Sequence, residues 1–127
     1  MNLNKMDTLN ITTSTNLLMR VREITSEHLP ISHSIIPYQI ILVVMYHHIM
    51  NEDLTVKQLF NSGPFSEMGN RYHYKRLVTD EWIILVNHPK DYRQKLIQPA
   101  LKSIQAFHAI SAKLNLTLPE IFTEIKT

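Results

Sequence analysis

The chain has 127 residues, 44% of them hydrophobic, and a net charge of +2 at pH 7. This length predicts one domain with a real core, small enough that a partner chain can help to bury its apolar surface. The absence of cysteine excludes disulfides and thiolate metal ligands and favours a reduced, cytoplasmic setting. A secretory signal is not expected, because the N-terminus MNLNKMDTLNITTSTN has no apolar core behind a basic start. A membrane span is not expected either, because the longest apolar stretch, IIPYQIILVVM, is too short to cross a bilayer.

Positive charge is concentrated in the middle of the chain. Residues 1–54 have a net charge of −2, residues 55–97 a net charge of +3, and residues 98–127 a net charge of +1. A locally basic segment suits a partner that contains phosphate, although an ordinary solvated face can have the same charge. The charge distribution alone therefore does not decide the function.

The N-terminal part of the sequence predicts a tail and two helices. Residues 1–13 are polar and rich in Asn and Thr, which is typical of a flexible tail. From about Thr15, apolar side chains recur at helical spacing until Pro30 ends the element. Ser34 and Pro37 then begin a second helix that is apolar on nearly all sides, and we expect it to be the buried central helix.

The middle of the sequence predicts two helices joined by a turn. Thr55 and Gln58 have the spacing of a capping box at the start of a short helix, and Gly63 suits its C-terminal end. Ser66 is a candidate N-cap for the next helix, which covers EMGNRYHYKRLVTDEW.

A β-hairpin and two further helices are predicted in the C-terminal part. The β-branched run WIILV favours a strand, NHPKDYR contains turn-forming residues, and KLIQ can return as the second strand. Pro99 ends that strand and begins a long helix, and the capping-box spacing of Thr117 and Glu120 predicts a final helix. The expected fold class is therefore mostly α (α+β), and two helices followed by a hairpin are typical of a winged helix-turn-helix.

The stretch from about Pro37 to Ser103 resembles the MarR-type transcriptional regulators. LTVKQLFNSGPFSEMGNRYHYKRLVTDEWI is similar to the helix, turn and recognition helix of that family, with RLVTDEWI at the usual exit. KDYRQKLIQPALKS resembles the family's wing motif, Asp-x-Arg, followed by an apolar strand and the start of a dimerisation helix. Glu81 stands where the family usually has a glycine with a left-handed backbone.

The resemblance implies a winged-helix domain over residues 14–127, with a DNA-binding lobe at about 35–98 and dimerisation helices at 14–30 and 99–127. It implies a homodimer that places a recognition helix in the major groove and a wing at the minor groove on each half of a pseudo-palindromic site. The residues expected at DNA are Ser66, Gly69, Asn70, Arg71, Tyr72, Lys75, Arg76, Lys90, Asp91 and Arg93.

For several of these residues we expect a more specific role in DNA binding. Arg71 and Lys75 are one helical turn apart and can reach base edges or phosphates. Ser66 and the amide groups at the start of its helix can hold a backbone phosphate. Within the wing, the resemblance implies that Asp91 steadies the loop and that Arg93 enters the minor groove.

Two apolar stripes, one near each end of the chain, favour a dimer, because a domain of this size cannot cover both internally. The sequence leaves open whether a small-molecule effector binds in the crevice between the dimer helices and the DNA-binding lobe. The residues expected at the dimer interface are Leu17, Leu18, Val21, Ile104, Phe107, Ile110, Leu114, Ile121 and Phe122.

Other classes of function have less support. The seven histidines show no HExxH or HxxxH spacing, so neither a metal nor a cofactor is expected, and a histidine-based hydrolase is a distant third hypothesis. The two glycines make no phosphate-binding loop and there is no nucleophile elbow, which argues against an enzyme. The alternative that stays open is a winged-helix module for protein interaction, or for plasmid or phage replication, that is not a ligand-responsive regulator.

Overall fold

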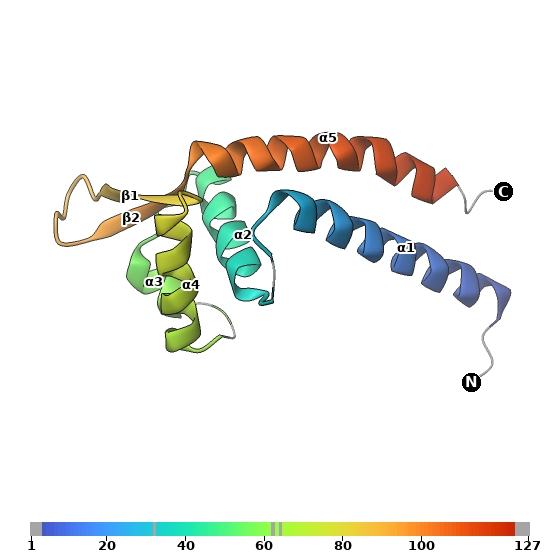
Figure 1. Ribbon diagram of the computed structural model, residues 1–127, viewed down its shortest axis with the longest axis horizontal. Helices are drawn as coiled ribbons and strands as arrows, with labels where there is room; N and C mark the ends of the chain where they lie inside the picture. The colour runs from blue at the N-terminus through green and yellow to red at the C-terminus, as the bar shows by residue number, and fades with distance from the viewer. Residues whose placement is uncertain (1–3, 32, 62, 64, 124–127) are drawn as a thin grey trace. The chain divides into compact units, whose positions relative to one another are not determined.

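The computed structural model describes residues 4–31, 33–61, 63 and 65–123. The described chain is mostly helical with one two-stranded sheet, as the sequence predicted. None of its helices combines the length and the apolar character that crossing a membrane requires. In chain order the elements are α1 (Lys5–His28), α2 (Ile36–Ile49), α3 (Val56–Asn61), α4 (Glu67–Thr79), β1 (Ile83–Asn87), β2 (Lys95–Pro99) and α5 (Leu101–Thr123) (Figure 1).

The chain divides into two compact units. Residues 30–105 form the first, which we call the lobe, and it contains α2, α3, α4 and the hairpin. Residues 1–29 and 106–127 form the second, which we call the helical unit, and it contains α1 and most of α5. Each unit is described below by itself.

In the lobe, α2 supplies the centre of the core. Its start follows the prediction, because the Ser34 hydroxyl accepts a hydrogen bond from the Ile36 N–H at 3.2 Å. Ile40 and Val44 on its inner side are almost completely buried. The expected burial holds for this side only, since the outer side exposes a row of apolar side chains. This outer α2 stripe consists of Leu42, Tyr46 and Ile49.

Capping side chains set the starts of α3 and α4, as predicted. The Gln58 N–H donates to Thr55 Oγ1 at 3.1 Å, and the Thr55 N–H donates to Gln58 Oε1 at 2.8 Å. Ser66 Oγ accepts a hydrogen bond from the Gly69 N–H at 3.1 Å. Between the two helices Gly63 has a φ of +91°, a conformation that glycine adopts without a steric penalty. Together with the hairpin, α3 and α4 form the predicted winged helix-turn-helix.

The hairpin pairs β1 with β2 in antiparallel register, with Leu85 opposite Ile97. The Ile97 N–H also donates to the Leu54 carbonyl at 2.8 Å, which bonds the hairpin to the segment that precedes α3. At the base of the hairpin, the buried Ser103 hydroxyl donates to the Trp82 carbonyl at 2.5 Å. Hydrogen bonds on both sides therefore fix the wing to the rest of the lobe.

A Schellman motif ends α4. The Glu81 N–H donates to the Val78 carbonyl at 3.1 Å, and the Trp82 N–H donates to the Leu77 carbonyl at 2.9 Å. Glu81 has a φ of +62°, in the left-handed region that favours glycine. The sequence resemblance places a family glycine at this position, and the geometry explains why a glycine suits it.

The left-handed backbone at Glu81 gives a stability prediction. Glu81→Gly should raise the free energy of unfolding by roughly 0.5–1 kcal/mol, because the steric penalty that it removes exceeds the backbone entropy that glycine loses. Asp80→Gly is the matched control, since Asp80 has a φ of −85° and should lose stability when replaced. Urea denaturation followed by circular dichroism measures both changes. A destabilised Glu81→Gly variant would contradict the assignment of strain at this position.

In the helical unit, α1 begins at Lys5, so the predicted tail over residues 1–13 is wrong from that residue onward. The Asn4 side chain caps the helix by accepting a hydrogen bond from the Asp7 N–H at 2.8 Å. Threonine hydroxyls in the first turns donate to carbonyl oxygens four residues earlier, at 2.7 to 3.1 Å. The polar composition therefore supports a helix here, and only residues 1–3 of that tail lie outside the described residues.

The C-terminal segment is one helix, whereas the sequence predicted two. Thr117 and Glu120 begin no new helix, and Pro119 lies inside α5. A proline inside a helix removes one backbone hydrogen bond, while two extra helix ends would leave several backbone groups in need of partners. Residues 124–127, which the predicted final helix included, lie outside the described residues.

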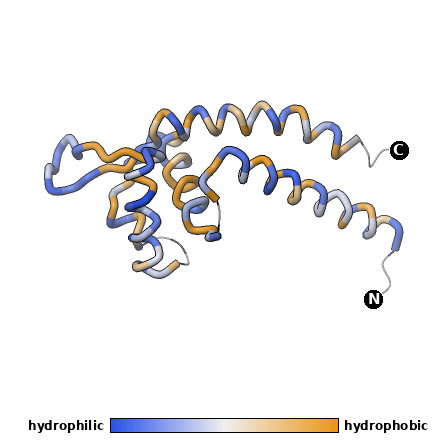
Figure 2. The backbone as a smooth tube through the Cα atoms, in the orientation of Figure 1, coloured by the Kyte–Doolittle hydropathy of each residue, from blue (hydrophilic) through white to orange (hydrophobic). Residues whose placement is uncertain are grey.

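Both helices of the helical unit are amphipathic, and Figure 2 shows hydrophobic and hydrophilic residues alternating along them. Ile24 of α1 and Ile121 of α5 are buried. Lys113 Nζ donates to Glu27 Oε2 at 2.7 Å, which links α5 to α1 and lowers the pKa of Glu27. Because the ion pair is exposed to solvent, it links the two helices but contributes little to stability.

Candidate nucleic-acid interface

The outward side of α4 presents four exposed side chains in a row. Met68, Tyr72, Lys75 and Thr79 follow the spacing of i, i+4, i+7 and i+11, which places them on one face of a helix. Met68 is 82% exposed and is the first large side chain of this row. Sequence reasoning selected Tyr72 and Lys75 but missed Met68 and Thr79, although the same spacing identifies them. We call these four residues the α4 outer row.

Arg71 lies beside the outer row, and its charge already has a partner. Its Nη2 donates to Glu67 Oε1 at 2.8 Å, one turn earlier on α4. The guanidinium carbon also lies 5.1 Å from the centre of the Phe60 ring of α3. Arg71 is exposed as predicted. A phosphate or a guanine must displace Glu67 before it can accept hydrogen bonds from all the donors of the Arg71 guanidinium.

Arg76 lies on the other side of the outer row, where it contacts Tyr72. Arg76 Nη1 donates to the Tyr72 hydroxyl at 3.2 Å, and the guanidinium lies 6.0 Å from the ring centre. This hydrogen bond raises the pKa of Arg76 above its ordinary value. Both side chains remain exposed, so α4 presents cations on both sides of the outer row.

Two residues predicted to contact DNA, Gly69 and Asn70, lie toward the inner side of α4, and their contact with DNA stays a prediction. Asn70 is 3% exposed, because it precedes the buried Leu77 by two helical turns and therefore lies on the inner face. Gly69 also faces inward, since a Cβ there would approach Ile36 Cδ1 to 3.0 Å. Ser66 is exposed, but its hydroxyl already accepts a hydrogen bond from the Gly69 N–H.

The wing loop, residues 88–94, is organised by two side chains that accept backbone hydrogen bonds. Asp91 Oδ1 accepts from the Arg93 N–H at 3.1 Å and from Arg93 Nε at 3.3 Å. His88 Nδ1 accepts from the N–H groups of Lys90 and Asp91 at 3.0 and 3.1 Å. The Arg93 side chain is 92% exposed. These hydrogen bonds are what the expected role of Asp91 in ordering the loop requires, whereas no sequence pattern points to His88.

Sequence comparison identifies no relative of this chain, since no protein-family model and no curated protein matches it. Solved structures do match. A MepR mutant from an S. aureus clinical isolate superposes with a TM-score of 0.61 at 14% identity, over 98% of this chain and 85% of that one. The transcriptional regulator PA4135 gives 0.59 at 17% identity, over 97% and 85% of the two chains. A MarR-like transcription regulator from Bacillus cereus gives 0.52 at 17% identity, over 90% and 78%.

The chain has the MarR-type winged-helix fold. The matches cover nearly the whole chain, and the comparison agrees with the order of helices and hairpin described above. The sequence prediction of this fold class is therefore confirmed. In the MarR-type fold, α4 is the second helix of the helix-turn-helix and β1–β2 is the wing.

His73 is half-buried in α4, and this gives a pH prediction. Burial, with a smaller contribution from Arg76, lowers the pKa of His73 below its ordinary value of 6.5. The unfolded chain then binds a proton more readily than the folded chain, so the free energy of unfolding should fall as the pH drops below about 6.5. Urea denaturation at about pH 7 and about pH 5 should show a smaller loss for His73→Gln than for the wild type. His108→Gln, at an exposed histidine, is the control. An equal loss of unfolding free energy in His73→Gln and in the wild type would contradict the prediction.

The residues expected at a dimer interface differ in accessibility. Leu18 is 67% exposed and Phe122 is 49% exposed, so both are available to a partner. Ile110 and Ile121 are buried within the single chain, so a partner could reach little of either side chain, and their place at the interface stays a prediction. The half-buried members are Leu17, Val21, Ile104, Phe107 and Leu114.

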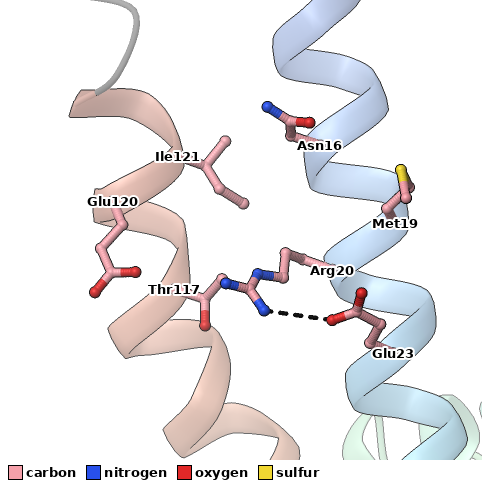
Figure 3. A pocket seen from close by; sticks show the side chains of 7 residues that line it. All are labelled: Asn16, Met19, Arg20, Glu23, Thr117, Glu120 and Ile121. Carbon is pink, nitrogen blue, oxygen red and sulfur yellow. Dashed lines mark hydrogen bonds and ion pairs between the residues drawn. The ribbon is translucent and has the colours of Figure 1, made fainter.

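A hollow of about 240 Å³ lies in the helical unit between α1 and α5 (Figure 3). Its lining is polar, with Arg20, Glu23 and Glu120 as the charged members. Arg20 Nη1 pairs with Glu23 Oε2 at 3.3 Å, so the cation is already compensated. No group of three or more metal-ligating side chains occurs among the residues that the structure describes.

Proposed function

We propose that the protein is a sequence-specific double-stranded DNA-binding transcriptional regulator that acts as a homodimer. The observation that supports this most is the pairing, within one lobe, of an exposed cationic α4 with a wing whose Arg93 extends into solvent. A helix of this kind fits the major groove, and an arginine on a hairpin fits the minor groove, where the negative potential is concentrated. Two of the three matched structures, PA4135 and the MarR-like protein from Bacillus cereus, are of transcription regulators.

The charges of the lobe suit this arrangement. Lys75, Arg76 and Arg93 have exposed side chains. Among the described residues, Lys75 and Arg76 form no ion pair with a carboxylate, and Arg93 pairs only with Asp91, at 3.3 Å. Lys90 adds a fourth exposed cation at the wing. We infer that these side chains contact phosphates or groove edges, while Arg71 engages only where an acceptor can replace Glu67.

Dimerisation is proposed through the helical unit. Exposed large apolar side chains occur on both of its helices, and a soluble monomer rarely leaves such residues clustered and uncovered. A second copy related by a two-fold axis would cover them and would set two α4 helices about one DNA turn apart, roughly 34–36 Å. The exposed set is Met6, Leu9, Ile11, Leu18, Met19, Leu116 and Phe122.

Fluorescence anisotropy with a labelled random duplex of about 30 base pairs tests the proposal directly. We expect binding whose logarithmic affinity falls linearly with the logarithm of the salt concentration, because phosphate contacts release counterions. Selection of bound fragments from random DNA should then yield a two-fold symmetric site. Failure to bind any duplex at micromolar protein and low salt would contradict the proposed function.

The outer α2 stripe supports a second candidate, a winged-helix module that binds another protein. Leu42, Tyr46 and Ile49 are apolar, exposed and aligned on one side of α2 in the lobe. Exposed rows of this kind are typical of protein contacts. This candidate predicts that the protein shows no salt-dependent binding to duplex DNA, so the anisotropy experiment separates the two functions.

A further inference from the structure

The α4 outer row has an arginine on each of its sides. The row runs from Met68 to Thr79, and its members fall within about 60° of one another around the helix. Arg71 and Arg76 lie about 70° to either side of the middle of the row, at about 100° of rotation per residue. Glu67 is the only carboxylate within α4, and it lies beyond the edge of the row, paired with Arg71. The row itself therefore contains no acid and lies midway between two cations.

The dimensions of the DNA major groove give the row and its two sides different contacts. A helix with its side chains is about 10–12 Å across and the groove is about 12 Å wide, so the sides of a helix in the groove meet the two phosphate backbones. The middle of the exposed face then meets the base edges. In α4 the arginines lie at the sides and the outer row lies in the middle, so the row is the part that would meet bases.

Met68 differs from the rest of the row in its side-chain chemistry. The Tyr72 hydroxyl accepts a hydrogen bond from Arg76 Nη1 at 3.2 Å. The Thr79 hydroxyl donates to the Lys75 carbonyl at 2.9 Å. Met68 has an unbranched apolar side chain that is 82% exposed, and it lies in the first turn of α4, the part of a recognition helix that contacts base edges. The base edge opposite Met68 must therefore suit an apolar side chain.

The major groove offers such a side chain one apolar partner, the C5-methyl group of thymine. The other distinctive groups on the base edges are hydrogen-bond donors and acceptors. An apolar side chain over a donor or an acceptor removes water from it and gives no hydrogen bond in return, which is unfavourable. Over a methyl group both apolar surfaces lose water, which is favourable. This difference in free energy would distinguish thymine from the other three bases.

We propose that Met68 selects thymine at one position of each half-site by packing against its C5-methyl group. The inference rests on the proposed function, since α4 must enter the major groove for the contact to form. A single exposed apolar side chain is common on protein surfaces. The position of Met68 in a row between two arginines is what assigns it to DNA.

Deoxyuridine in place of thymine isolates the proposed contact, because it removes only the methyl group and keeps the pairing with adenine. A symmetric duplex is first selected from random DNA with the wild-type protein, and each thymine is then replaced in turn. In fluorescence anisotropy, one such replacement should lower the wild-type affinity about fourfold in one half-site and about fifteenfold in both, the value of burying one methyl group per subunit. Met68→Ala should bind the thymine and deoxyuridine duplexes with equal affinity.

Met68→Leu and Met50→Ala are the matched controls. Leucine keeps an apolar side chain of similar size, so Met68→Leu should keep the preference for thymine. Met50 is exposed in the lobe outside α4, so Met50→Ala should behave as the wild type does. Circular dichroism should show that all three variants are folded, because neither methionine belongs to the buried core.

Two kinds of negative result have different meanings. A wild-type protein that binds no duplex would refute the proposed function and the methyl contact together. A wild-type protein that binds duplex DNA but tolerates deoxyuridine at every thymine would refute the methyl contact alone. The same holds if Met68→Ala keeps the wild-type ratio of affinities for the two duplexes.

Discussion

Replacing Lys75 and Arg93 together by alanine should weaken binding to a specific duplex by roughly a thousandfold at about 0.15 M salt. The double variant removes two cations per subunit, hence four per dimer, from an exposed helix and an exposed wing. If all four meet phosphates, the slope of log K against log salt should become shallower by about three to four units. Anisotropy titrations at several salt concentrations measure both quantities.

Lys113→Ala is the matched control for this variant, because it removes a cation that is paired with Glu27 in the helical unit. It should leave both the affinity and the salt slope nearly unchanged. Asp91→Ala gives a sharper test of the wing, since simple electrostatics predicts tighter binding after loss of an acid. We expect weaker binding, because Arg93 would lose the oxygen that accepts from its N–H and its Nε. Tighter binding by Asp91→Ala would show that the wing does not reach DNA.

The second large effect concerns assembly. Leu18→Glu combined with Phe122→Glu should convert the dimer into a monomer, because each change puts a charge on an apolar side chain that is exposed in the single chain. A monomer contacts one half-site only, so its affinity for the full site should fall by at least about a hundredfold through loss of bivalent binding. Light scattering at micromolar concentration measures the assembly state, and anisotropy measures the affinity.

Leu101→Glu is the matched control for the assembly prediction. Leu101 is as exposed as Leu18 but belongs to the lobe part of α5, so this variant should remain dimeric. Circular dichroism should confirm that all variants are folded, since neither Leu18 nor Phe122 contributes to the buried core. A wild-type protein that is monomeric under these conditions would refute the two-half-site arrangement.

Local signals in the sequence were sufficient for most elements of the lobe. The capping box at Thr55 and Gln58 and the cap at Ser66 predicted the two helix starts, because a cap involves residues only three positions apart. The β-branched run WIILV and the turn residues after it predicted the hairpin, because these signals are local as well. The spacing of Asn70 to Leu77 predicts that both share one face of the helix, and Asn70 was nevertheless counted among the DNA contacts because it belongs to the recognition helix.

The ends of the chain were harder to predict. Thr and Asn residues favour both loops and helix caps, and the outcome depends on whether their side chains find backbone partners, as Asn4 does. Pro119 is similarly ambiguous, because its effect depends on the helix that surrounds it. His88 shows a third difficulty, since one imidazole nitrogen that accepts two backbone N–H groups leaves no pattern in the sequence.

The ion pair between Glu67 and Arg71 has a consequence for discrimination among binding sites. Glu67 is an intramolecular competitor for Arg71, but an exposed pair at this spacing is worth only about 0.3–0.5 kcal/mol, so it gives a modest advantage to acceptors that offer a two-point contact. Complexes held by Lys75 and Arg93 alone would leave the pair intact and dissociate quickly. The protein would then stay longer on a site that engages Arg71 than on a site that leaves Arg71 paired with Glu67.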